Sequence, residues 1–210
     1  MKKLTSSLPF RLLIGVIVGI VVGLVANATV IQVILTIKEL LGSLINFCVP
    51  LIIIGFIAPS ITRLKSNASR MLGLALVLAY SSSVCAALIS MGAGFAIIPS
   101  LSIQSAAEGL RDTPELLFTL AIDPIMSVMS ALVFSVLVGL AATWAKADTI
   151  TNVLEEFQRI VLDIVTRVII PILPFFIAGT FAGLAYQGSI TKQLPVFLIV
   201  ILIVMVGHYI

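Results

Sequence analysis

Long apolar stretches without a formal charge constrain this chain more than any other feature. No Lys, Arg, Asp or Glu occurs between Arg11 and Lys38, and further apolar stretches follow up to the last residue. Hydrophobic residues make up 60% of the chain and charged residues 10%, against about 45–50% and about 25% in soluble domains. So few charges cannot cover a surface that faces water. The sequence therefore predicts an integral membrane protein, and excludes a disordered chain or a disulfide-stapled secreted domain.

The apolar stretches predict an all-α polytopic fold with six transmembrane helices, because a helix needs about 20 apolar residues to cross the hydrocarbon core. The expected helices cover residues 12–26, 40–62, 71–98, 124–144, 160–186 and 194–210. We expect Asp123 and Pro124 to begin the fourth, since these residue types favour the N-cap and the first helical position. The sixth is still apolar at Ile210, so we expect a truncated helix and a fragment of a longer protein.

The distribution of basic residues predicts a cytoplasmic N-terminus. With that orientation the cytoplasmic side carries Lys2, Lys3, Arg11, Arg63, Lys65, Arg70, Lys146 and Arg159, and the outer side carries Lys38, Arg111 and Lys192. The first three helices then start inside and the last three start outside. Such an arrangement predicts an inverted repeat of the kind found in secondary transporters.

The first apolar stretch has two interpretations. The basic start and the short apolar segment fit a signal peptide, whereas Gly15, Gly19 and Gly23 recur at the four-residue spacing of a helix-packing face. This spacing and the further apolar stretches favour a retained first helix.

Motifs for enzymatic chemistry and metal binding are absent from the sequence. It contains no phosphate-binding Gly-x-x-x-x-Gly-Lys loop, no His-Glu-x-x-His and no Cys-x-x-Cys. We expect Cys48 and Cys85 to be buried thiols within apolar helices, and the single histidine, His208, to serve helix packing or an interface. The predicted protein is not an enzyme, carries no cofactor or resident metal, and does not bind nucleic acid.

Two polar groups within the predicted helices have both a functional and a structural interpretation. Asp163 and Arg167 are one helical turn apart, so we expect them to pair, either as a gate or as an interfacial ion pair. Residues 80–83 read Tyr-Ser-Ser-Ser. Their hydroxyl groups suit coordination of a monovalent cation, but serines in membrane helices also bond to their own backbone.

Proline-containing segments carry a resemblance to a known family. Residues 44–61 contain a Val-Pro-Leu run followed by small residues and the basic turn Arg63-Leu-Lys65. Residues 131–141 read Ala-Leu-Val-Phe-Ser-Val-Leu-Val-Gly-Leu-Ala, and residues 168–179 read Val-Ile-Ile-Pro-Ile-Leu-Pro-Phe-Phe-Ile-Ala-Gly. In this order the segments resemble the second, fourth and fifth helices of the dicarboxylate/amino acid:cation symporters, the sodium:dicarboxylate or glutamate transporter family.

The resemblance implies a homotrimer in the cell inner membrane. In this family the first, second, fourth and fifth helices form a rigid scaffold, and the third and sixth belong to a mobile transport domain that moves like an elevator. The family's serine-rich re-entrant hairpin, its Asn-Met-Asp-Gly-Thr motif and the helices around them do not occur here. The resemblance therefore places the substrate-binding residues beyond Ile210.

The resemblance also implies a candidate cation site on the third helix. The family uses a Tyr-x-x-Thr-Ser stretch there, and Tyr80 and Ser83 keep the distance from tyrosine to hydroxyl while Val84 replaces the next hydroxyl. Aligning Ser82 and Ser83 with Thr-Ser instead displaces the tyrosine. The candidate cation-binding residues are accordingly Tyr80, Ser82 and Ser83.

The resulting functional prediction is a symporter that couples sodium or protons to the uptake of acidic amino acids or C4-dicarboxylates, with this chain forming its N-terminal half. The alternative is a small standalone membrane scaffold or interaction protein without transport activity.

Overall fold

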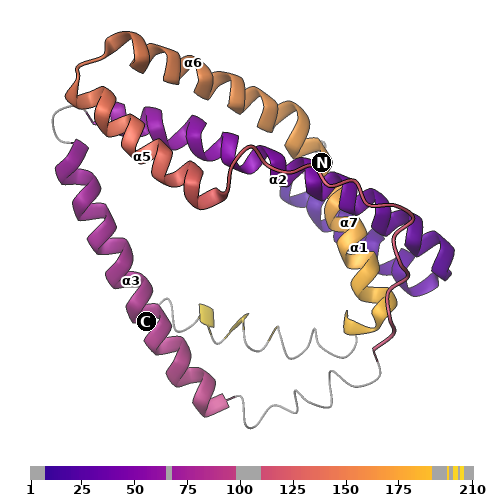
Figure 1. Ribbon diagram of the computed structural model, residues 1–210. Coiled ribbons are helices and arrows are strands. Elements are labelled where there is room, and N and C mark those ends of the chain that lie inside the picture. The colour runs from indigo at the N-terminus through magenta and orange to yellow at the C-terminus, as the bar shows by residue number, and fades with distance from the viewer. Residues whose placement is uncertain are drawn as a thin grey trace.

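Helices make up most of the described part of the chain. The computed structural model describes residues 8–64, 68–97 and 110–190, together with residues 198, 201, 202, 204 and 205 (Figure 1). Its elements are α1 (Leu8–Val25), α2 (Ala28–Arg63), α3 (Ala68–Ile97), α5 (Val128–Trp144), α6 (Asp148–Ile164), η3 (Val165–Ile169) and α7 (Ile170–Gln187). No strand occurs among these residues. Four helical segments are long and apolar enough to cross a membrane, and α5 is a shorter apolar helix. The all-α membrane fold is confirmed, and the expected sixth helix lies largely outside the described residues.

Two long helices form the axis of the structure. Helix α2 has 36 residues and runs antiparallel to the continuous segment α6–η3–α7 (Figure 1). Gly42 of α2 faces Phe176, Gly55 faces Val161, and the side chain of Arg63 bonds that of Glu155. At 1.5 Å per residue α2 is about 54 Å long, longer than the hydrocarbon core of about 30 Å. It therefore lies tilted in the membrane or extends past it.

The boundaries of the second, fourth and fifth helices differ from those predicted. Helix α2 begins at Ala28 rather than at residue 40, with Asn27 as its N-cap. Helix α5 begins at Val128, where Ser127 caps it by accepting from the Ser130 N–H at 3.1 Å, so Asp123 and Pro124 lie in an extended segment instead. The fifth predicted helix, expected from residue 160, already begins at Asp148 because the amphipathic α6 continues directly into α7.

A tight turn joins α5 to α6. Lys146 adopts a left-handed conformation with φ 51°, and its N–H bonds the Thr143 carbonyl at 3.3 Å. The Ala147 N–H bonds the Ala142 carbonyl at 3.0 Å. These two bonds are those of a Schellman motif, which satisfies the last carbonyls of α5 and reverses the chain. Helix α6 therefore returns antiparallel to α5.

The glycine stripe of α1 packs directly on the backbone of α7. Gly15, Gly19 and Gly23 are all buried. A Cβ atom at Gly15 would lie 2.7 Å from the Pro174 carbonyl oxygen, and a Cβ atom at Gly19 would overlap the Ala178 carbonyl oxygen. Without Cβ atoms the two helices run parallel in close contact. The packing role predicted from the glycine spacing is confirmed.

A π-helical turn marks the change from the amphipathic α6 to the apolar α7. The Ile170 N–H bonds the Val165 carbonyl, five residues back. Pro171 follows; it has no N–H to donate, and in a regular α-helix its ring would clash with the carbonyl four residues earlier. The wider turn accommodates this ring within an otherwise continuous helix. Beside it, Arg167 Nη2 lies 3.2 Å from Asp163 Oδ2, which confirms the predicted pairing.

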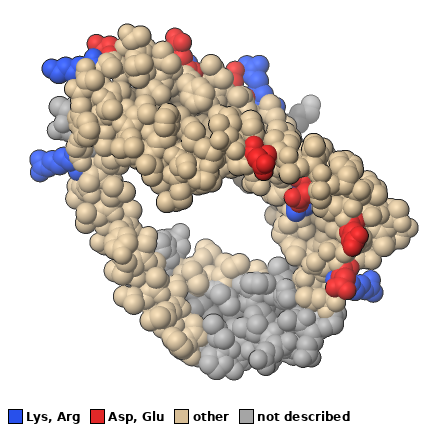
Figure 2. All heavy atoms as spheres, in the orientation of Figure 1, with Lys and Arg blue, Asp and Glu red and all other residues tan. Residues whose placement is uncertain are grey.

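Helix α3 stands apart from the packed helices. Its contacts with the packed helices are few and are mainly with α2 and α5 (Figure 1), and none of its described side chains is buried. The Trp144 indole N–H bonds the Ser69 hydroxyl at 3.2 Å, near the start of α3. Figure 2 shows charged side chains on the outer edge of the packed helices, and α3 as an almost uncharged arm. A helix that is apolar on all sides requires lipid or protein around it.

The two cysteines have different environments. Cys48 in α2 is buried, as predicted, whereas Cys85 in α3 is exposed. The expectation for Cys85 was wrong because an apolar run shows that a helix avoids water, but not whether another helix covers it.

Candidate functional site

The candidate cation-binding residues lie on α3, away from the packed helices. Tyr80 is 75% exposed, and Ser82 and Ser83 are exposed as well. Tyr80 and Ser83 are three residues apart and so share one face of the helix. A sodium ion takes several oxygen ligands, and among the described residues no second helix lies over this face to supply them. The cation site therefore remains a prediction that depends on ligands from outside the described part of the chain.

A polar cavity of about 520 Å³ lies between α2, α7 and the extended segment 110–127. Two hydrogen bonds donated by backbone N–H groups of that segment fasten it to the helices. The Arg111 N–H donates to the Gln187 carbonyl at 3.0 Å, and the Leu117 N–H donates to the Thr36 hydroxyl oxygen at 3.1 Å. The cavity lining includes the side chains of Lys38, Glu39, Glu115, Thr180 and Gln187, so it contains both signs of charge.

Lys38 is the central cation of this cavity. Its Nζ lies 3.3 Å from Glu39 Oε2 and 5.9 Å from the ring centroid of Phe176, and 29% of its side chain is exposed. A Cβ atom at Gly179 of α7 would lie only 2.7 Å from the Lys38 Cβ. The lysine is thus half-buried between α2 and α7, and both a carboxylate and an aromatic face compensate its charge.

The packing of α7 shows which part of α1 lies at the same height as Lys38. Gly179 of α7 faces Lys38. The residue before it, Ala178, contacts Gly19 in the middle of the apolar α1 through its carbonyl group. Lys38 and Glu39 therefore lie within α2, level with the apolar part of α1. Paired charges at this depth are expensive and are typical of polar pathways or cavities. The sequence feature that could have indicated this placement is the apolar run on both sides of Lys38.

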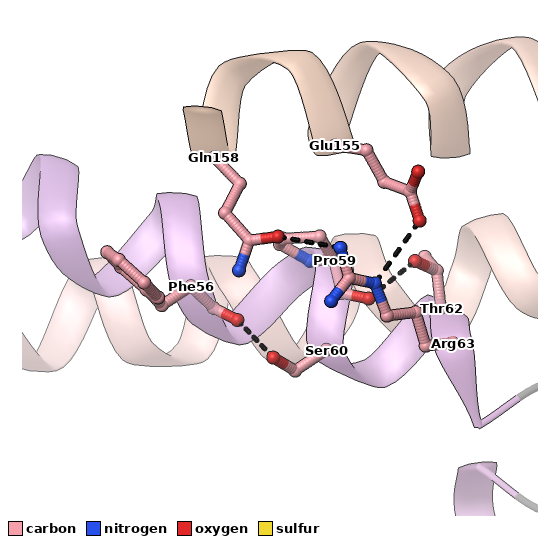
Figure 3. A network of polar contacts seen from close by, with 7 residues as sticks. All are labelled: Phe56, Pro59, Ser60, Thr62, Arg63, Glu155 and Gln158. Atoms are coloured by element: carbon pink, nitrogen blue, oxygen red, sulfur yellow. Dashed lines mark hydrogen bonds and ion pairs between the residues drawn. The ribbon is translucent and has the colours of Figure 1, made fainter. Parts of the chain in front are cut away.

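The second polar cluster ties the C-terminal end of α2 to α6 (Figure 3). Arg63 Nε lies 3.2 Å from Glu155 Oε1, and Arg63 Nη2 donates to Gln158 Oε1 at 2.9 Å. On α2 itself, the Thr62 hydroxyl donates to the Pro59 carbonyl at 2.9 Å. An arginine here also suits the negative end of the α2 dipole. The cluster has the character of a structural clamp, since it joins two helices and both of its charges are partly exposed.

Reversing one charge of this clamp should lower the free energy of unfolding slightly, and reversing both charges should restore it. We expect Arg63→Glu and Glu155→Arg each to lower the free energy of unfolding by up to about 1 kcal/mol, because exposed ion pairs are worth about that much. The double variant should recover most of the loss. A double-mutant cycle of unfolding in mixed detergent micelles measures this coupling.

Glu156 provides the matched control for the charge exchange. It is adjacent to Glu155 but exposed, and Arg63 bonds Glu155 rather than Glu156. Combining Arg63→Glu with Glu156→Arg should therefore give no recovery. Equal recovery by both double variants would mean that the effect is general electrostatics and not this contact.

The described residues contain no group of three His, Cys, Asp or Glu side chains that could hold a metal ion. The residues that line the polar cavity can form hydrogen bonds and compensate the charge of small polar species.

Comparison with known proteins agrees with this membrane architecture. The family described as the sodium:dicarboxylate symporter family matches residues 8–210, which include all three segments that carry the resemblance. No curated protein and no solved structure gave a match. Since the family match covers nearly the whole sequence, the chain belongs to the sodium:dicarboxylate symporter family.

Proposed function

We propose that this chain forms the N-terminal part of a secondary active transporter that carries acidic amino acids or C4-dicarboxylates together with sodium ions or protons. The proposed location is the inner membrane, with a cytoplasmic N-terminus and three copies per transporter. The family match is the observation that carries the proposal. Ion gradients supply the free energy, since moving one unit charge across 100 mV is worth about 2.3 kcal/mol.

The packing of the helices supports a division into scaffold and mobile parts. Helices α1, α2, α5 and α6–α7 contact one another in a continuous chain of interfaces, whereas α3 meets this group only weakly. The packed helices are those that the resemblance assigns to the scaffold, and α3 is the helix it assigns to the transport domain. A helix with few scaffold contacts can move without breaking a packed core.

Uptake into proteoliposomes tests the proposed function. We propose that the substrate-binding residues follow Ile210, so the 210-residue chain should insert into membranes and take up no aspartate, glutamate or succinate. The product of the coding sequence read beyond Ile210 should take up one of these substrates when a sodium or a proton gradient is imposed. Uptake by the 210-residue chain alone would overturn the placement of the substrate site, and no uptake by either product would favour the scaffold protein without transport.

Removing the Ser83 hydroxyl tests the candidate cation site in the transporter that shows uptake. If Ser83 is a sodium ligand, Ser83→Ala should raise the sodium concentration for half-maximal uptake about tenfold, since a polar contact to a charged group is worth about 1.5 kcal/mol. Ser81→Ala removes a neighbouring hydroxyl that is not a candidate and should leave the sodium dependence unchanged. An unchanged sodium dependence in Ser83→Ala would assign that serine to packing.

A further inference from the structure

A narrow groove follows the line of contact between α1 and α7. Its first part has a volume of about 470 Å³ and begins at Arg11. Its second part has a volume of about 190 Å³ and reaches Val22. Val18, Phe175 and Ala178 line both parts, so the two are continuous.

The shape of the groove results from the glycine packing described above. Gly15 and Gly19 of α1 and Ala178 of α7 form a floor of small residues, because the two backbones are in direct contact there. Larger side chains stand at the sides, and Phe175 is 71% exposed. From Arg11 to Val22 the groove rises by about 16 Å at 1.5 Å per residue, about half of a hydrocarbon core of about 30 Å. Its length therefore matches one leaflet of the bilayer.

The charge of the groove is concentrated at one end. Arg11 is the only charged residue that lines the first part, and it lies at the boundary of the charge-free stretch of α1. Within the described ranges Arg63 and Arg167 are paired with carboxylates, and Arg11 forms no ion pair. At the far end, the charge of Lys38 is already compensated by Glu39. The groove should therefore attract an anion, and the anion should bind next to Arg11.

We propose that this groove binds one anionic glycerophospholipid, with the phosphate on the Arg11 guanidinium and one acyl chain along the small-residue floor toward Val22. Guanidinium groups bind phosphate oxygens through paired hydrogen bonds, which suits Arg11 at the level of the headgroups. An acyl chain fills an apolar groove one leaflet long and covers the exposed side chains beside it. A lipid with net negative charge is favoured over a zwitterionic lipid, whose own cation competes with Arg11 for the phosphate. This inference is independent of the proposed transport activity.

Fluorescence quenching by brominated lipids tests the proposal on the full chain. Trp144 is the only tryptophan, so Trp144→Phe combined with Phe175→Trp places a single reporter in the groove. Vesicles of phosphatidylcholine carry a fixed small fraction of brominated phosphatidylglycerol or, in parallel, of brominated phosphatidylcholine. We expect the relative binding constant from quenching to favour phosphatidylglycerol about fivefold, the equivalent of about 1 kcal/mol for one basic residue at the membrane surface.

Two substitutions separate the charge of the groove from its shape. Arg11→Gln should reduce the preference to about one, whereas Arg70→Gln, which removes an exposed charge on α3, should leave it unchanged. Ala178→Phe should abolish the preference by filling the floor while Arg11 is retained. Equal quenching by both lipids in the parent would indicate ordinary surrounding lipid and overturn the proposal. Absence of quenching by either lipid would show that protein covers the groove, and would overturn it as well.

Discussion

Replacing Gly19 by leucine should break the contact between α1 and α7 and lower the free energy of unfolding by about 3 kcal/mol. Overpacking in a well-packed interior costs about 1–3 kcal/mol, and this site belongs at the upper end of that range. A Cβ atom at Gly19 meets the backbone carbonyl of Ala178, which cannot rotate away as a side chain can. The whole of α1 must therefore move. Unfolding of the purified chain in mixed detergent micelles, followed by circular dichroism, measures the loss.

Gly73 on α3 provides the matched control for Gly19. It is also a glycine within an apolar helix, but nothing lies within 4 Å of a Cβ atom built there. Gly73→Leu should leave the stability unchanged or raise it by up to about 1 kcal/mol, because leucine has the higher helix propensity. Equal losses at Gly19 and Gly73 would mean that the glycines matter for helix flexibility and not for the contact with α7.

The glycine stripe shows which parts of the fold the sequence predicts. Small residues at a fixed spacing predict that two helices approach closely, and the structure confirms this for Gly15, Gly19 and Gly23. The sequence does not name the partner helix, because any helix with exposed backbone carbonyls could serve. The parallel contact with α7, which follows more than a hundred residues later in the chain, requires the tertiary structure.

Charged residues account for the error in the start of the second helix. The predicted second helix begins at residue 40, directly after Glu39, because charges are costly in lipid. In the structure Lys38 and Glu39 neutralise each other beside a polar cavity, so the helix continues through them to Ala28. Whether a charge ends a membrane helix depends on its partners, and the residues that form this cavity with Lys38 come from distant parts of the sequence.

The candidate cation site was predictable only as a set of residues on one helix. The hydroxyl spacing of Tyr80 and Ser83 follows from the sequence, and the structure places both on the exposed surface of α3. A coordination shell requires oxygen atoms from several segments at a common distance, and local spacing contains no information on those segments. The prediction of Tyr80, Ser82 and Ser83 therefore stands as it was made, for uptake measurements to decide.

Replacing Ala142 by leucine should produce the second large effect, a loss of about 1–3 kcal/mol in the free energy of unfolding. The buried face of α5 consists of small residues, namely Ala131, Ser135, Gly139 and Ala142. Gly139 on this face would place a Cβ atom 2.9 Å from Ile61 Cβ of α2, so the two helices leave no space for larger side chains. The Ala142 carbonyl also accepts the Ala147 N–H that closes the turn into α6. Displacing α5 would therefore strain both its contact with α2 and the start of α6.

The adjacent Ala141 makes this prediction specific to the buried face. Ala141 is exposed, and Ala142 is 7% exposed, although both belong to the same apolar turn of α5. Ala141→Leu adds the same atoms on the outer side, where they contact lipid or detergent, and should change the stability by less than about 0.5 kcal/mol. A large difference between the two variants in the same unfolding assay would locate the effect in the α2–α5 interface. Similar values would mean that α5 lies loosely on α2, and the scaffold would then consist of α1, α2 and α6–α7 without it.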